Sequence, residues 1–113
     1  MSAQPTEIFK YGLKLGSDTL RNRKYRIELA STTWQQIAAM CLKNGEKVPA
    51  EIHTVDQFIY TVSGIGYAIV GDQITTVEAG DAILVPAGVK HEIGNNGYDV
   101  FKFFTLYSPP EEE

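Results

Sequence analysis

The chain has 113 residues, with 10 Lys and Arg against 14 Asp and Glu, a hydrophobic fraction of 43% and a formal net charge of −4. This length and composition are typical of one globular domain with one hydrophobic core, and they exclude disordered and collagen-like classes. The acidic balance argues against nucleic-acid binding, which needs clustered positive charge, and no apolar run approaches the roughly 20 residues of a membrane helix.

The pattern of the chain predicts an all-β protein. Short segments rich in β-branched and aromatic residues alternate with turn signals such as Asn44-Gly45 and Gly71-Asp72. Such spacing is typical of an antiparallel sandwich or barrel. A helical turn, capped by Ser17 or Asp18, is predicted over residues 17–24. The predicted strands, in chain order, are 25–29, 33–42, 57–62, 67–70, 74–77, 82–85 and 100–107.

We interpret residues 1–113 as a single domain with a barrel core over about residues 25–107. The polar segment 1–6 and the segment 109–113 are expected to be flexible, because Pro109-Pro110 ends the last strand and a solvated acidic tail follows. The N-terminal residues show no secretory signal. The single cysteine, Cys41, forms no internal disulfide, which favours a cytoplasmic location.

Two segments have spacings that point to a family. The first contains, at fixed intervals, Gly45, Glu51, His53, Gln57 and Gly64, and the second Gly80, Pro86, Gly88, His91 and Asn95. They resemble the two motifs of the cupin superfamily, G-x5-H-x-H-x3,4-E-x6-G and G-x5-P-x-G-x2-H-x3-N. The second motif matches at every defined position, whereas the first departs at Glu51, where His is usual, and at Gln57, where Glu is usual. The resemblance implies a cupin fold, a double-stranded β-helix or jelly-roll barrel.

A closer resemblance extends to the C-terminal region. The pattern E-x-H-x3-Q over residues 51–57, followed by Tyr107-Ser-Pro109-Pro110-Glu111, looks like a group of small single-domain bacterial cupins, the monocupins. In that group these residues are usual, so Glu51 and Gln57 are interpreted as a group trait. Members are commonly labelled as mannose-6-phosphate-isomerase-like, a label that rests on fold, and fold does not carry function.

The resemblance implies a metal site. Its expected ligands are Glu51, His53, Gln57 and His91, which would bind one divalent transition metal per chain (Fe, Ni, Mn or Zn). Residues 51 and 53 would share one face of a strand, a turn over 54–56 would return Gln57 to that face, and His91 would close the set. Imidazole, carboxylate and amide donors all suit such ions, and both histidines of the sequence fall on these positions.

Strand parity predicts the lining of a pocket. If Lys43 and Lys102 point outward, Cys41 does too, toward solvent or a partner subunit. A small-molecule pocket is then expected, lined by Gln36, Met40, Ile59, Phe101 and Phe103, although the same residues also suit a plain barrel core. No Lys or Arg is expected beside the metal ligands, so phosphate recognition is unsupported, which argues against a sugar-phosphate isomerase. No spare His or Glu is expected there to serve as general base.

We expect a metal-binding cupin that acts on a small organic molecule, as a metal-dependent enzyme of the dioxygenase, isomerase or lyase type. One carboxylate against a divalent ion leaves the site near +1, which favours an anionic ligand. The ion would polarise that ligand or activate a bound water. Two alternatives stay open. One is a non-catalytic small-molecule binding or sensing cupin, and the other a metal-free epimerase-like cupin with His53 or His91 as base.

A homodimer is also expected, by the same resemblance and because Ile27, Leu29 and Ile37 make one outer sheet face too apolar for water. Sedimentation velocity at micromolar concentration should show a species of twice the chain mass of 12.5 kDa. A monomer under these conditions would contradict this expectation.

Overall fold

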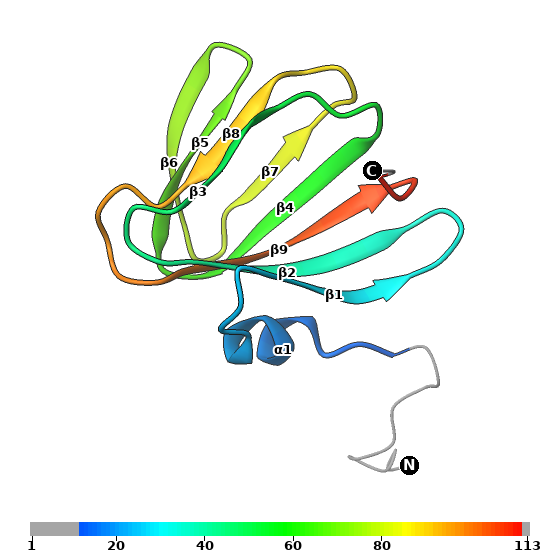
Figure 1. Ribbon diagram of the computed structural model, residues 1–113, viewed down its shortest axis with the longest axis horizontal. Coiled ribbons are helices and arrows are strands. Elements are labelled where there is room, and N and C mark those ends of the chain that lie inside the picture. The colour runs from blue at the N-terminus through cyan, green and yellow to red at the C-terminus, as the bar shows by residue number, and fades with distance from the viewer. Residues whose placement is uncertain (1–11, 112–113) are drawn as a thin grey trace.

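The computed structural model describes residues 12–111, which form one short helix and nine strands. The strands make two antiparallel sheets that face each other as the walls of a barrel (Figure 1). The larger sheet has the order β1-β2-β9-β4-β7 and the smaller one β3-β8-β5-β6. The elements are α1 (Leu15–Arg21), β1 (Arg26–Ser31), β2 (Gln36–Leu42), β3 (Lys47–Glu51), β4 (Asp56–Ser63), β5 (Ile65–Val70), β6 (Gln73–Glu78), β7 (Ala82–Val85), β8 (His91–Gly94) and β9 (Phe101–Ser108).

All seven predicted strands are present, with ends shifted by at most three residues, but the sequence pattern missed β3 and β8. Pro49 in β3 cannot donate to a ladder, and the pairing of β3 with β8 is irregular between Val48 and Glu51, as at a bulge. Strand β8 has four residues, one of them glycine. Neither segment therefore shows the alternation that signals a strand.

The predicted helix is present but begins and ends earlier. Lys14 is its N-cap and provides no side-chain cap, so the prediction of a cap at Ser17 or Asp18 is wrong. The helix ends at Arg21, and the backbone of the next residue, Asn22, is extended. The Asn22 side-chain oxygen accepts a hydrogen bond from the Lys24 N–H at 3.0 Å, which stabilises this turn away from the helix. Within residues 12–111, this seven-residue helix is too short to cross a membrane.

The inner face of β9 joins the core to a polar end of the barrel. Phe101 and Phe103 are almost fully buried, and they pair in register with Leu42 and Met40 of β2. Burial of side chains of this size contributes roughly 1.5–3 kcal/mol each. Farther along the same face of β9 the inward residues Thr105 and Tyr107 carry hydroxyl groups, so one end of the barrel interior is apolar and the other is polar.

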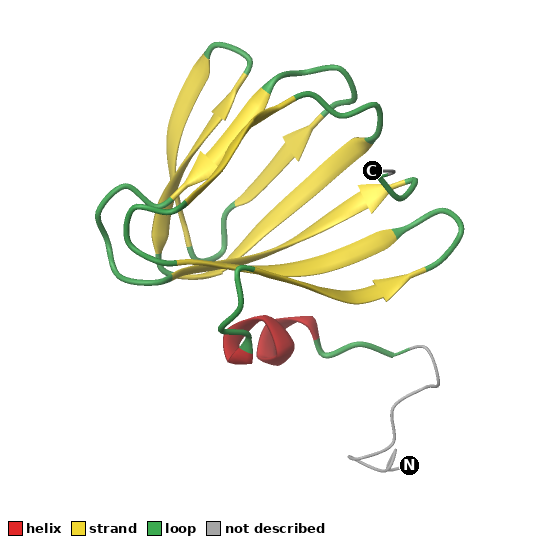
Figure 2. Cartoon of the chain, in the orientation of Figure 1, coloured by secondary structure: helices red, strands yellow, loops and turns green. Residues whose placement is uncertain are grey.

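The outer face of the larger sheet is covered in part by the chain itself. Helix α1 packs under β2, β9 and β4, as Figure 2 shows. Cys41 is 3% exposed on this side, so it points neither into solvent nor freely toward a partner. Ile37 is also buried, whereas Ile27 and Leu29 are half-buried. The predicted homodimer therefore has less apolar surface available than the sequence suggests, and it stays a prediction.

Asn95, the last residue of the second spaced pattern, ties two loops together. Its buried side chain donates to the carbonyls of Leu42, at 3.1 Å, and Asp99, and accepts from the Tyr98 N–H at 3.0 Å. Its backbone bonds in both directions to the turn before β3. The β2–β3 turn and the β8–β9 loop are thereby fixed at the apolar end of the barrel.

Replacing Asn95 by Ala should lower the free energy of unfolding by about 1–3 kcal/mol, because buried backbone groups lose their partners. Urea denaturation measures this change, and Asn96→Ala, at the exposed neighbouring position, is the matched control. Equal stabilities of the two variants would contradict the structural role of Asn95.

Candidate metal centre

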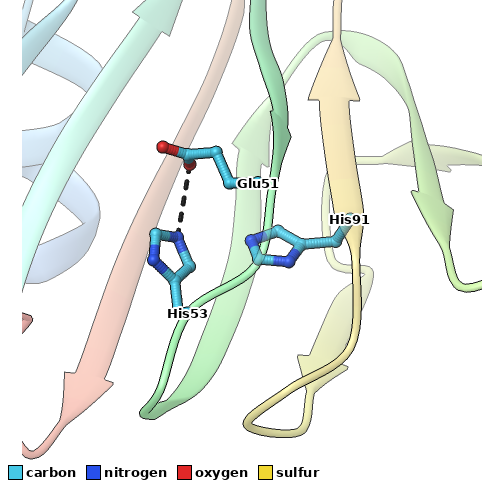
Figure 3. Close-up of side chains that lie close together, drawn as sticks. All are labelled: Glu51, His53 and His91. Atoms are coloured by element: carbon cyan, nitrogen blue, oxygen red, sulfur yellow. Dashed lines mark ion pairs between the residues drawn. The ribbon is translucent and has the colours of Figure 1, made fainter.

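Three of the four predicted ligands lie together at the polar end of the barrel. The ligand atoms of Glu51, His53 and His91 all lie within 4.8 Å of one another. The close-up in Figure 3 shows the three side chains pointing toward one another. Glu51 is the last residue of β3 and stands directly opposite His91, the first residue of β8. The two sheet neighbours thus bring a carboxylate and an imidazole to one point.

His53 reaches the site from a loop and not from a strand, which differs from the prediction. Strand β3 ends at Glu51, and the intervening Ile52 is 63% exposed while His53 is buried. The loop is held in place because the Gly88 N–H donates to the His53 carbonyl oxygen at 2.8 Å. The result is nevertheless the inward placement of both residues that the spacing predicts.

Gln57 approaches from the opposite sheet. The chain turns at residues 54–55, and Gln57 is the second residue of β4, where it lines the same cavity as Glu51 and His91. Its amide nitrogen donates to the Thr105 hydroxyl at 2.8 Å and to the Tyr107 hydroxyl at 3.4 Å. The amide is therefore oriented, and its buried oxygen Oε1 has no hydrogen-bond partner among residues 12–111.

Each of the two imidazoles likewise has one ring nitrogen in contact with a neighbour and one buried nitrogen without a hydrogen-bond partner among residues 12–111. His91 Nδ1 lies 2.9 Å from the Val89 carbonyl oxygen, so this nitrogen is the donor and Nε2 is the ring nitrogen left to bind an ion. His53 Nδ1 contacts the Glu111 carboxylate, and its Nε2 lies 3.2 Å from Oε1 of Glu51. Both Nε2 atoms are buried and have no hydrogen-bond partner among residues 12–111.

These donors fit a divalent transition metal ion. Leaving a buried polar atom without a partner costs about 1–3 kcal/mol, so such atoms are rare and need an explanation. Here three of them come from the four residues that the resemblance implies as ligands, and the fourth residue is a carboxylate. Two imidazole nitrogens, one carboxylate and one amide oxygen are a set that Fe, Ni, Mn and Zn accept.

Glu111 is a site residue that the sequence analysis assigned to a solvated tail. Its side chain is 29% exposed, and its backbone N–H donates to Gln36 Oε1 at 3.2 Å. Just before it, the Ser108 hydroxyl donates to the Trp34 carbonyl oxygen at 3.2 Å. Residues 108–111 thus fold back against the barrel, which corrects the expectation for Glu111. Residues 1–6 and 112–113 lie outside the described residues.

A cavity of about 240 Å³ adjoins the ligands. Of the residues predicted to line a pocket, Met40 and Phe103 lie on its wall, whereas Ile59 and Phe101 pack in the core. Gln36 is not on the wall, and its side chain binds Glu28 and the backbone of Glu111. The substrate role of these residues stays a prediction.

Arg26 and Tyr107 also line the cavity, and the sequence analysis identified neither of them as a lining residue. The expectation that no Arg or Lys, and no spare Glu, lies beside the ligands is wrong, because Arg26 and Glu111 line the cavity. Burial raises the pKa of the Tyr107 hydroxyl, Arg26 opposes the rise and Glu111 adds to it. Arg26 pairs in register with Met40. Because Met40 is expected to point inward, extending the alternation of β2 to its neighbour β1 would have predicted that Arg26 points inward as well.

Comparison with known proteins agrees with this architecture. The family model described as the cupin domain matches residues 38–107. The chain belongs to the cupin family. The expected fold is confirmed, since a cupin family protein of Methanocaldococcus jannaschii with a double-stranded β-helix fold superposes on it with a TM-score of 0.70 at 26% identity, covering 79% of this chain and 84% of that chain.

Three related proteins show the reach of the similarity. A Bacillus halodurans protein, BH2720, has a crystal structure that superposes with a TM-score of 0.87 at 30% identity, covering 92% of this cupin and 84% of that chain. A protein of Acanthamoeba polyphaga mimivirus is 34% identical over 89% of this chain and 66% of its own length. The Bacillus subtilis protein YrkC is 34% identical over 81% of this chain and 53% of its own length. This cupin therefore spans about half to two thirds of these last two relatives.

Proposed function

We propose that this cupin is a metal-dependent enzyme that acts on a small organic molecule, with one divalent transition metal ion held by Glu51, His53, Gln57 and His91. The observation that carries the proposal is the set of three buried donor atoms, on His53, Gln57 and His91, that have no hydrogen-bond partner among residues 12–111. Each belongs to a side chain whose other polar atom is already bonded or in contact. The free atoms are therefore the ones left for an ion.

The surrounding residues keep the donors in ligating form. The Val89 carbonyl and the Glu111 carboxylate each engage an Nδ1 atom, so Nε2 is the ring nitrogen left for an ion on both histidines. Thr105 and Tyr107 engage the Gln57 nitrogen, so the carbonyl oxygen faces the site. A bound divalent ion supplies Lewis-acid chemistry, polarising an oxygen of the ligand or lowering the pKa of a water.

Two features of the cavity support an enzyme of the dioxygenase, isomerase or lyase type. The cavity adjoins the ligands directly, so a small molecule inside it reaches the same point as the metal donors. Glu111 also supplies a carboxylate outside the ligand set, with one oxygen on His53 and the other available as a proton acceptor. Such a group is what the sequence analysis found lacking.

Replacing His91 by Ala should abolish metal binding, because the ion loses one of two imidazole ligands. Inductively coupled plasma mass spectrometry should find about one transition metal ion per chain in untagged wild-type protein purified without chelator, and little in the variant. Lys90→Ala, at the adjacent exposed position, is the matched control and should keep the metal. Unchanged metal content in His91→Ala would refute the ligand assignment.

The same proteins test for catalysis. With the metal identified, oxygen consumption, isomerisation and elimination assays should show turnover in wild type and in Lys90→Ala, and loss of turnover in His91→Ala. If no metal binds to wild type even after incubation with Fe, Ni, Mn and Zn salts, the proposed function is wrong.

Replacing Glu111 by Gln should weaken metal affinity by roughly 10- to 100-fold, the usual cost of losing a carboxylate behind a ligating histidine. Competition with a chromophoric chelator measures the affinity, and stoichiometry at saturating metal should stay unchanged. The control is Glu78→Gln, which removes an exposed carboxylate on β6. Equal affinities of the two variants would show that Glu111 does not support His53.

A further inference from the structure

One guanidinium in the cavity wall forms no ion pair with a carboxylate of residues 12–111. Arg26 begins β1, pairs in register with the cavity-lining Met40, and is itself partly buried. None of the ion pairs among residues 12–111 includes Arg26, although two carboxylates, Glu51 and Glu111, line the same cavity. Its charge is permanent, because a guanidinium does not lose its proton in proteins.

Arg26 is connected to the metal ligands through Tyr107. The guanidinium carbon lies 5.7 Å from the centre of the Tyr107 ring, a distance at which cation and ring attract each other. The hydroxyl of that ring accepts from the amide nitrogen of Gln57. One side chain therefore separates the guanidinium from a proposed metal ligand, so a small molecule in the cavity can contact both.

The charge balance of the cavity favours an anion. Glu51 and Glu111 together offset the two charges of a divalent ion, and Arg26 then leaves one net positive charge within the wall. A partly buried cation without a partner is costly, and a bound anion removes that cost. A neutral ligand would leave the guanidinium donors without a charged acceptor.

We propose that Arg26 binds the carboxylate of the substrate, so that this cupin acts on a small carboxylic acid; this inference rests on the proposed function. The two oxygens of a carboxylate match the guanidinium fork. A phosphate dianion would bring more charge against Glu51 and Glu111, and Arg26 is the one Lys or Arg among the residues lining the cavity. A cavity of about 240 Å³ is also smaller than the roughly 300–1,000 Å³ of sites for drug-sized ligands.

Matched acids and amides test the proposal. Isothermal titration calorimetry with metal-loaded protein compares lactate with lactamide, malonate with malonamide, and succinate with succinamide. At least one acid should bind wild type about tenfold or more tightly than its amide, as expected for a charge-assisted hydrogen-bonded pair. In Arg26→Gln this preference should largely disappear, while the metal content stays at the wild-type value.

Two further variants make the result specific. Arg23→Gln, which removes an exposed arginine just before β1, should keep the full preference for the acid. Arg26→Lys keeps the charge but loses the fork, so its preference should fall between those of wild type and Arg26→Gln. Arg26→Lys also provides the comparison if Arg26→Gln does not fold.

Three outcomes would overturn the proposal. Acids could bind Arg26→Gln as tightly as wild type, or no acid could bind wild type more tightly than its amide. Inorganic phosphate could also bind through Arg26 more tightly than every acid. Metal analysis of the same samples separates this proposal from the metal assignment. An acid preference that depends on Arg26 in a protein without metal would support the carboxylate site and refute the proposed enzyme.

Discussion

The alternation of side chains along β9 is the constraint on which the core and the site both depend. Strand β9 lies between β2 and β4 in the larger sheet, and every second residue points into the barrel. Phe101 and Phe103 fill the apolar end, and Thr105 and Tyr107 follow on the same face. A shift of one residue in register would move the phenylalanines into the outer layer and the amide-holding hydroxyls away from Gln57.

Contacts within the chain orient the donors at the polar end of the barrel. Each donor is fixed by a neighbour that uses its other polar atom: Thr105 for Gln57, the Val89 carbonyl for His91 and Glu111 for His53. Such contacts fix the amide orientation and the imidazole tautomer in the folded chain. A metal ion can then bind without the free-energy cost of ordering these groups. The cost appears instead as buried atoms without partners.

The cavity wall combines two kinds of charge for different purposes. Glu51 and Glu111 lie next to His53, where they complement a cation, whereas Arg26 packs on Tyr107 without an ion pair among residues 12–111. A wall with carboxylates near the donors and one guanidinium beside them is suited to a ligand that has a metal-binding oxygen and a separate negative group. This complementarity is a property of side chains from both sheets and the C-terminal segment, and no single element contains it.

The sequence by itself determined the strands with strong alternation and the inward face of β2 and β9, and its resemblance to the cupin motifs supplied the residues proposed as metal ligands. These depend on local periodicity and on fixed spacings, which can be read along the chain. It did not determine β3 and β8, because Pro49 and the short run His91–Gly94 hide their pairing. It also placed His53 on a strand, although a loop held by Gly88 positions it.

Only the tertiary structure decided that Arg26 and Glu111 belong to the site. Arg26 enters through the register of β1 on β2, and Glu111 through the return of residues 108–111 to contacts with Trp34, Gln36 and His53. Both placements depend on contacts between residues far apart in the chain. Local composition, which places Glu111 in an acidic tail, carries no information about such contacts.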